Sequence, residues 1–350
     1  MLVTAIAFAA GGPAAAGRVL LLAAVEISLS FDNAVVNATV LRRLNAFWQR
    51  LFRTVGVLVA VVGMRLLFPL LVVAFSARLS PFAALHLALA DPHTYDQRLD
   101  AARPEISAFG GAFLTMVFLD FLLAERDLHW LRPLERLSAR IGRLDRVAPL
   151  IALAALITAA SAGRHPGTQV SAVLMAGLLG VMTQLLISGL QGLTGPQEGD
   201  ASDATSPDSQ PPDTPPTTAG RPALLSGREA LLAFCFLELM DASFSFDGVI
   251  GAFAFTSNLL VIAAGLGIGA LAMRTLTVRL VHGGTLNHYV YLEHGAHYAI
   301  GLLGILLLAS AYHDLPELLT GLLGVSVIAA ALASSVVRNR RRAGTPANTP

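Results

Sequence analysis

The stretch that decides the fold is EISLSFDNAVV at residues 26–36, and the chain repeats it in altered form as DASFSFDGVIG at residues 241–251. Both copies follow one frame: an acid, any residue, Ser, Leu or Phe, Ser, Phe and Asp. A Met-Arg pair follows each copy in the next apolar run, in GMR at 63–65 and in AMR at 272–274. A match of this length and order indicates that the chain contains two repeats of one structural unit.

The sequence around these repeats is that of a multi-pass membrane protein. Of its 350 residues 55% are hydrophobic and only 13% are charged, whereas soluble domains carry about 25% charged residues. Runs of about 20 apolar residues mark helices that cross a bilayer. We therefore predict an all-α polytopic membrane helix bundle with about nine transmembrane helices. The predicted spans are 18–41, 54–77, 106–124, 147–162, 169–190, 229–255, 258–280, 289–311 and 317–337.

The arginines outside the predicted spans orient the bundle. They are dense directly after the first span, in the loop 125–146 and in the tail 338–350. Nine spans place these three segments on one side, which the positive-inside rule makes cytoplasmic. We expect a plasma (inner) membrane protein with its N-terminus outside and its C-terminus in the cytoplasm. The two acidic motifs then cross in opposite directions, which defines an inverted-topology repeat.

A polar segment divides the chain into two membrane halves. Residues 193–223 are rich in Pro, Ser, Thr and Asp, and this composition predicts a disordered cytoplasmic linker. The predicted parts are a first half 1–192 with its acidic motif at 26–36, the linker, a second half 224–337 with its acidic motif at 238–251, and a basic cytoplasmic tail 338–350.

Acidic side chains outnumber basic ones in the predicted spans. An ionised carboxylate at the bilayer centre costs roughly 2.5–3.5 kcal/mol on insertion scales, and only Arg65 and Arg274 lie comparably deep. Either a bound cation or protons supply the missing charge, or acids pair with the two arginines and only hold helices together. The acids in or beside the spans are Glu26, Asp32, Asp120, Glu238, Asp241, Asp247 and Glu293.

The motif residues carry oxygen atoms of the kind that bind hard cations. Carboxylates, Asn carbonyls and Ser hydroxyls suit Mn²⁺, Ca²⁺ or Mg²⁺. At about 100° per residue one helical stripe holds Glu26, Ser30, Asn33 and Asn37, whereas Asp32 lies well around the helix. Either the helix is broken near Ser-Phe-Asp, or the acids face different neighbours. In the second half the corresponding stripe holds Glu238, Asp241 and Ser245.

The segment LNHYVYLEHGAHYAIG at residues 286–301 holds a further polar cluster. Glu293 and His297 are four residues apart, and His294 and His297 are three apart, so each pair shares a helix face. Two such side chains on one helix face could form a transient metal-binding site or a proton relay. His and Tyr side chains at a membrane edge explain the pattern equally well.

Several stretches resemble the TerC family of membrane proteins, and most of all a little-studied branch with long Ser-Phe-Asp motifs. The family is similar to LysE-type exporters and includes members implicated in tellurium resistance and in Mn²⁺ export. In the second repeat Gly248 stands where the first has Asn33, which predicts a half-site with fewer ligands. The stretches are EISLSFDNAVVNA, GMRLLFP, FGGAFLTMVFLDF, ELMDASFSFDGVIGAFA and YLEHGAHYAIGLL. As metal ligands the resemblance implies Glu26, Asp32, Asn33, Asp241 and Asp247. The supporting residues that we predict are Ser30, Asn37, Arg65, Glu238, Ser245, Arg274, Glu293 and His297.

The leading hypothesis is a secondary transporter that exports a divalent cation, with Mn²⁺ first, through paired acidic motifs. Asp32 and Asp247 would be the central ligands, with Glu26 and Asp241 as further ligands or proton carriers. Arg65 and Arg274 would hold the empty site together after the ion leaves. The sequence has no GxxxxGK[ST] loop, no HExxH motif and no nucleophile with a paired base. We therefore expect no enzyme, no catalytic residue and no permanently bound cofactor.

Two alternatives stay open for the function. The first is export of an organic solute or a tellurium oxyanion that the two arginines bind, and the second is a non-transporting membrane scaffold for stress proteins. The expected partners are the lipid bilayer and the transported ion, without nucleic acid, and a homo-oligomer is compatible with the sequence.

Overall fold

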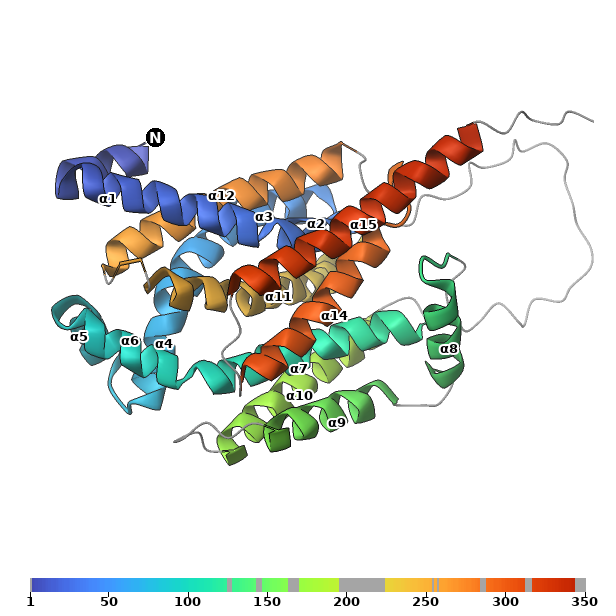
Figure 1. Ribbon diagram of the computed structural model, residues 1–350, viewed down its shortest axis with the longest axis horizontal. Helices are drawn as coiled ribbons and strands as arrows, with labels where there is room; N and C mark the ends of the chain where they lie inside the picture. The colour runs from blue at the N-terminus through green and yellow to red at the C-terminus, as the bar shows by residue number, and fades with distance from the viewer. Residues whose placement is uncertain are drawn as a thin grey trace, which may run out of the picture.

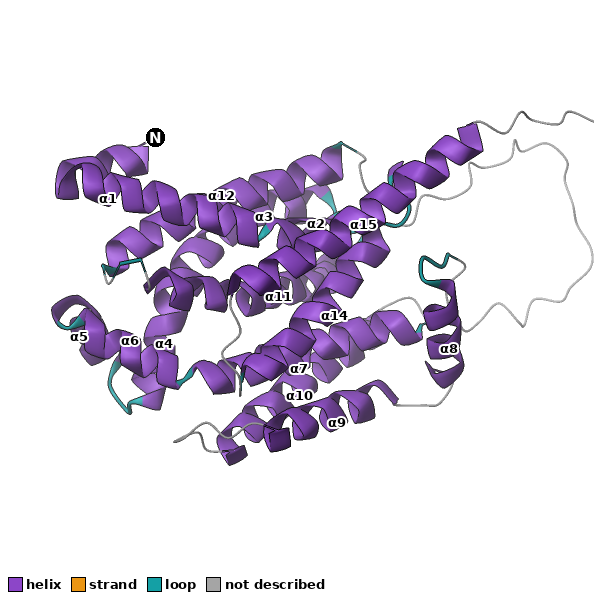
Figure 2. Cartoon of the chain, viewed as in Figure 1, coloured by secondary structure: helices purple, strands orange, loops and turns teal. Residues whose placement is uncertain are grey.

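The computed structural model of the chain is a bundle of α-helices. It describes residues 2–124, 128–142, 147–162, 170–194, 224–253, 255–256, 258–283, 288–311 and 317–343. Within these ranges the chain forms helices and short connections and no strand (Figure 2). The all-α membrane bundle that the sequence predicts is therefore confirmed.

Each predicted span corresponds to one helix or to a run of consecutive helices. The elements are α1 (Leu2–Leu29), α2 (Phe31–Leu41), α3 (Ala46–Leu58), the π-helix η1 (Val59–Leu67), α4 (Phe68–Ser76), α7 (Arg103–Leu123), α9 (Val147–Ala162), α10 (Val170–Thr194), α11 (Gly227–Phe253), α12 (Leu259–His282), α14 (Leu292–Ser310) and α15 (Glu317–Ala343). With α1–α2 and α3–η1–α4 each taken as one pass, the helices cross the bundle in alternating directions (Figure 1).

By length and composition alone, fewer helices qualify as spans than the nine predicted. Among the residues described, six helices are long and apolar enough to cross a membrane, or seven if α1 and α2 form one bent span. The helix α9 has only 16 residues. The helix α11 has 27 residues but includes Glu238 and Asp241 among its charged side chains. Both still run alongside the longer helices (Figure 1).

The helix that carries the second acidic motif runs opposite to the helices that carry the first. The end of α2 lies beside the start of α11, because the Leu225 amide donates to the Arg43 carbonyl at 2.8 Å. The Asn45 amide in turn donates to the Leu225 carbonyl at 3.3 Å. This antiparallel arrangement agrees with the inverted-topology repeat.

The first repeat is broken at its motif, whereas the second is not. Residue Ser30 separates α1 from α2, and the two helix axes differ in direction by 56°. The motif of the second repeat lies inside the continuous helix α11. A second irregularity is the π-helix η1, in which Arg65 lies near the C-terminal end. Irregular backbone inside a membrane bundle is tolerated only where protein or a water-filled cavity surrounds it.

Short helices lie at the two ends of the bundle. The segment between the predicted spans 54–77 and 106–124 folds into α5 (Pro81–Ala90) and α6 (Pro92–Ala101). Asp91 caps α6 by accepting from the Thr94 amide at 3.2 Å and from its hydroxyl at 2.6 Å. These bonds hold the pKa of Asp91 below its usual value. The helix α8 (Arg132–Gly142) lies at the opposite end (Figure 1).

We call this opposite end the basic end. There α2 passes into α3, α8 lies across the bundle, and α15 finishes (Figure 1). The described parts of the three arginine-rich segments therefore lie at the same end of the bundle (Figure 1), as the predicted topology requires. The helix α15 continues to Ala343, into the predicted tail. The predicted linker falls outside the described residues from position 195 onward and stays a prediction.

Helices α1 and α12 pack in close contact through glycines of α12. A Cβ atom placed on Gly269 would lie 2.4 Å from Cγ of Glu26 in α1. One turn earlier, a Cβ on Gly265 would lie 2.6 Å from Cβ of Leu22. The two pairs follow the same order along both helices, so α12 runs parallel to α1. From Gly269 onward, α12 therefore lies beside the first acidic motif.

The substitution Gly269→Ala is expected to lower the free energy of unfolding by roughly 1–3 kcal/mol, because the added methyl group overpacks the contact with Glu26. The measurement is an SDS titration of the detergent-solubilised protein. Gly189→Ala is the matched control, since a Cβ there meets nothing within 4 Å. Equal effects of the two substitutions would contradict this packing.

Candidate functional site

A buried polar pocket lies where the two repeats meet. It has room for about one water-sized particle. Residues of both halves line it, and they come from α1, α2, η1, α11 and α12. The lining residues are Glu26, Ser30, Asn33, Ala34, Asn37, Arg65, Asp241, Ala270, Met273, Arg274 and Thr277.

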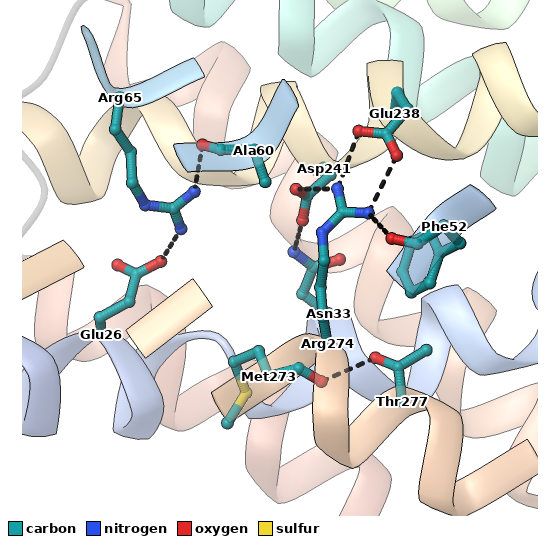
Figure 3. A network of polar contacts seen from close by, with 10 residues as sticks. All are labelled: Glu26, Asn33, Phe52, Ala60, Arg65, Glu238, Asp241, Met273, Arg274 and Thr277. Carbon is teal, nitrogen blue, oxygen red and sulfur yellow. Dashed lines mark hydrogen bonds and ion pairs between the residues drawn. The ribbon is translucent and has the colours of Figure 1, made fainter. Parts of the chain in front are cut away.

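The first repeat contributes an ion pair between Glu26 of α1 and Arg65 of η1. Arg65 donates through Nη2 to Oε1 of Glu26, and both side chains are 4% exposed. A second donation runs from Nη1 of Arg65 to the Ala60 carbonyl at 2.8 Å (Figure 3). The acid of the first motif is thus neutralised by the arginine of its own Met-Arg pair.

The second repeat contributes a larger cluster around Arg274 of α12. Its guanidinium donates to both carboxylate oxygens of Glu238, at 3.0 and 2.8 Å, and to Asp241 at 3.3 Å. It also donates to the Phe52 carbonyl at 3.1 Å and lies 4.2 Å from the centre of the Phe52 ring (Figure 3). Three helices are joined through this one cation.

The two clusters are equivalent under the alignment of the repeats. Glu26 corresponds to Asp241, and Arg65 corresponds to Arg274. In each half, the arginine of the Met-Arg pair neutralises the first acid of the motif. The repeat seen in the sequence is therefore also a repeat of ion pairs.

A hydrogen bond links the first repeat to the second. Nδ2 of Asn33 in α2 donates to Oδ1 of Asp241 in α11 at 2.7 Å (Figure 3). The position equivalent to Asn33 is Gly248, and a Cβ placed there would lie 3.0 Å from Oε2 of Glu26. The short acid of the second half, Asp241, thus bonds to the Asn33 amide of the first half. The long acid of the first half, Glu26, lies against Gly248 of the second half.

This arrangement changes how Gly248 is interpreted. The sequence suggested a half-site with one ligand fewer than its partner. Because Glu26 is one methylene longer than Asp241, its carboxylate extends into the space that an Asn side chain would need. The glycine provides room for a longer acid.

Four buried polar atoms around the pocket have no hydrogen-bond partner in the part of the chain that the structure describes. They are Oδ1 of Asn33, Oδ1 of Asn37, Nε of Arg65 and Nε of Arg274. Buried polar atoms are normally satisfied by protein or by water. A polar ligand or a water molecule in the pocket would give these atoms a partner.

The five predicted metal ligands do not come together as one shell. Glu26, Asn33 and Asp241 line the pocket. Asp32 faces α15 instead, since Oδ2 would lie 2.3 Å from a Cβ placed on Gly324. Its Oδ1 accepts from the Asn33 amide at 2.9 Å. The side chain of Asp247 lies outside the described residues.

The searched part of the chain contains no group of three or more His, Cys, Asp and Glu side chains positioned to hold a metal ion. The rotation of Asp32 away from the pocket follows from its place next to Asn33 on the helix, about 100° around the axis. Metal binding by this set of residues stays a prediction.

The supporting residues are divided among three places. Ser30, Asn37, Arg65 and Arg274 line the pocket, and Glu238 holds Arg274. Ser245 is buried, and its hydroxyl has no partner among the residues described.

Glu293 and His297 lie away from the pocket, towards the basic end. Glu293 pairs with Arg42 and with Arg43, which joins the end of α2 to the start of α14. His297 stacks on the Phe121 ring with 3.9 Å between ring centres. Nδ1 of His297 also lies 2.8 Å from the Glu293 carbonyl, and the Phe121 ring contacts His294 as well. A relay through these side chains stays a prediction.

Sequence reasoning missed Thr277 and Phe52. Thr277 lies three residues after Arg274 and thus on the same helix face, so its spacing could have identified it as a lining residue. Phe52 of α3 contacts Arg274 of α12 through its backbone carbonyl and its ring. No pattern within the sequence indicates such a contact.

The fold and the pocket define a polytopic membrane protein with two oppositely oriented halves around a buried polar site. The chain matches, over residues 31–342, the family described as "Protein of unknown function (DUF475)". Because this match covers most of the chain, the protein belongs to that family. No curated protein and no solved structure matches the chain. The resemblance to TerC proteins stays a prediction.

The substitution Arg65→Ala is expected to lower the free energy of unfolding by about 3–5 kcal/mol, because it leaves Glu26 as an unpaired buried charge. The double substitution Glu26→Gln/Arg65→Gln should recover most of this loss. Arg43→Ala is the control, with an expected effect below about 1 kcal/mol because its side chain is 61% exposed. If Arg65→Ala and Arg43→Ala had similar effects in SDS titration, the buried pair would not be a structural requirement.

Gly248→Asn is expected to destabilise the protein, because the new amide needs the space that the Glu26 carboxylate occupies. Adding Glu26→Asp should restore thermal stability by rebuilding the short-acid and amide combination of the other half. The melting temperatures of wild type, both single variants and the double variant form a double-mutant cycle. If the effects of the two substitutions on the melting temperature were strictly additive, the two side chains would not compete for the same space.

Proposed function

We propose that the protein is a secondary transporter that moves a small cation through the pocket between its two halves, with Mn²⁺ as the first substrate to test. The observation that carries this proposal is the pocket itself. It is polar, it is buried between oppositely oriented repeats, and it has room for about one water-sized particle. Transporters with inverted repeats commonly place their substrate and ion sites at the repeat interface.

The charges around the pocket favour a cation. Three carboxylates, of Glu26, Glu238 and Asp241, meet two guanidinium groups, of Arg65 and Arg274. The lining alone carries two acids and two arginines, and Glu238 behind Arg274 adds one excess negative charge when all three carboxylates are ionised. The unpartnered oxygens of Asn33 and Asn37 add neutral acceptors, which hard cations such as Mn²⁺ accept as ligands.

The arginines provide a reason why the site is stable without substrate. In the structure each one neutralises acids of its own repeat, which an empty buried site needs. A cation that enters would compete with Arg65 for Glu26 and with Arg274 for Asp241. Release of the cation would let the ion pairs form again.

The irregular backbone provides places where the halves can move. The break at Ser30 and the π-helix η1 both adjoin pocket residues. A change of angle at Ser30 would move Asn33, and with it the hydrogen bond to Asp241. Alternating access would then arise from exchange between two related arrangements of the halves.

We further propose that the basic end faces the cytoplasm, following the positive-inside rule. Export would then run from the basic end towards the end that carries α5 and α6. The chain has no nucleotide-binding loop, so a proton gradient or the membrane potential is the proposed energy source.

Export of an oxyanion, including a tellurium oxyanion, is the second candidate. The specific observation in its favour is that Arg65 and Arg274 line the pocket and each has a buried, unpartnered Nε. Against it stand the excess of negative charge and the small volume, which leaves little room for an organic solute.

The substitution Asp241→Asn is expected to reduce Mn²⁺ uptake into proteoliposomes at least about tenfold, the factor that corresponds to loss of about 1.4 kcal/mol of interaction. Uptake of Ca²⁺, Mg²⁺, Zn²⁺ and tellurite is measured alongside. Asp120→Asn is the matched control, since this acid accepts from Gln184 at 3.0 Å and does not line the pocket.

Three results would overturn the proposal. Uptake that survives Asp241→Asn unchanged would remove the pocket from the pathway. Absence of flux for every solute, from folded and inserted protein, would favour the non-transporting scaffold. Tellurite flux that depends on Arg65 and Arg274 would favour the oxyanion exporter.

A further inference from the structure

The helix α8 has its polar face towards the protein and its apolar face outwards. Glu135 and Ser138 are only 8% and 6% exposed, whereas Leu134 and Leu137 are 43% and 57% exposed. A helix on the surface of a water-soluble protein shows the reverse pattern. Single exposed leucines need no explanation, but this inversion along one helix does.

The buried polar face is held by specific hydrogen bonds. The Glu135 carboxylate accepts from the amides of Trp130 and Leu131, at 3.0 and 3.2 Å, and from the Tyr298 hydroxyl at 3.1 Å. The Leu128 carbonyl, just before α8, lies 2.9 Å from Nε2 of His294. These contacts fix which side of α8 faces the bundle, so the exposure of the leucines is set by the fold.

The position and direction of α8 are those of a helix that lies along a membrane surface. It lies at the basic end, with its axis across the long helices of the bundle (Figure 1). At 11 residues it is about 16 Å long, too short to cross a bilayer. A helix across the end of a membrane bundle lies near the plane of the lipid headgroups.

The charge of this segment selects the kind of membrane surface. Arg136 is exposed between the two leucines. Residues 132–146 contain five arginines and two acids, of which Glu135 is buried. Guanidinium groups bind phosphates in a bidentate manner. Basic residues beside a membrane are attracted to anionic lipids.

We propose that α8 is an interfacial helix that binds an anionic phospholipid leaflet. Leu134 and Leu137 enter the boundary between headgroups and acyl chains, and Arg136 binds lipid phosphates. A second copy of the chain fits less well, because two such basic faces repel each other. A stable protein interface also needs about 1,200–2,000 Å² of buried surface, which one face of this helix does not offer.

The test places a fluorescent probe on the apolar face of the full-length protein. Cys235 is the single cysteine of the chain, so Cys235→Ser gives a background in which Leu137→Cys is labelled with NBD. The protein is reconstituted into vesicles of phosphatidylcholine alone or with added phosphatidylglycerol. Arg228→Cys, exposed at the start of α11, is the control for a position in water.

The expected result is blue-shifted emission of the probe at residue 137 and quenching by shallow nitroxide lipids, both stronger with phosphatidylglycerol. Arg136→Gln should weaken the effect of phosphatidylglycerol by about fivefold, the contribution of one arginine near an anionic surface. Monodisperse elution of each labelled variant shows that it is folded. These readouts do not depend on transport.

Three results would overturn the proposal. Emission typical of water in both vesicles would show that α8 faces solvent. Equal quenching with and without phosphatidylglycerol would remove the role of the arginines. Blue-shifted emission that lipid nitroxides do not quench would mean that protein, either a second copy or another segment of the chain, covers the leucines.

Discussion

The neutralisation of buried carboxylates by Arg65 and Arg274 is the constraint on which the rest of this structure depends. A charge without a partner inside a membrane bundle is costly, so each motif must reach the arginine of the following helix. This requirement fixes how closely the helices approach. Glycines in α12 and α11 let the Glu26 side chain pass between backbones, and Phe52 supports Arg274 from a third helix.

The residues that the sequence predicts correctly are those whose position follows from periodicity and charge. Apolar runs located the helices, and the excess of acids over arginines pointed to Glu26, Asp241 and their partners. A break near Ser-Phe-Asp was one of two alternatives that the sequence left open, and the first repeat has it at Ser30. The π-helix η1 and the direction of Asp32 towards Gly324 could not be predicted. They depend on packing between distant helices. The two motifs share Ser, Phe and Asp, yet only one is broken, so local sequence does not decide the break.

The pocket combines a fixed part with a part able to move. Arg274 makes contacts with Glu238, Asp241 and Phe52, which hold α3, α11 and α12 together. On the other side, α2 begins directly after the break and reaches α11 through the bond from Asn33 to Asp241. In the proposed mechanism, a small change at Ser30 would therefore alter the bond from Asn33 to Asp241, while the contacts of Arg274 with Glu238 and Phe52 lie on the other side of the guanidinium group from this change (Figure 3).

Glu26 lies against Gly248, whereas the shorter Asp241 bonds to Asn33. This difference between the two pairs bears on how the two halves are related. Two copies of the first half would set Asn33 against Glu26 and overfill the site, while two copies of the second would set Gly248 against Asp241 and leave a hole. Only the unlike pair fills the space. The two halves are thus complementary in this space, and two identical copies of either half would not reproduce the pocket.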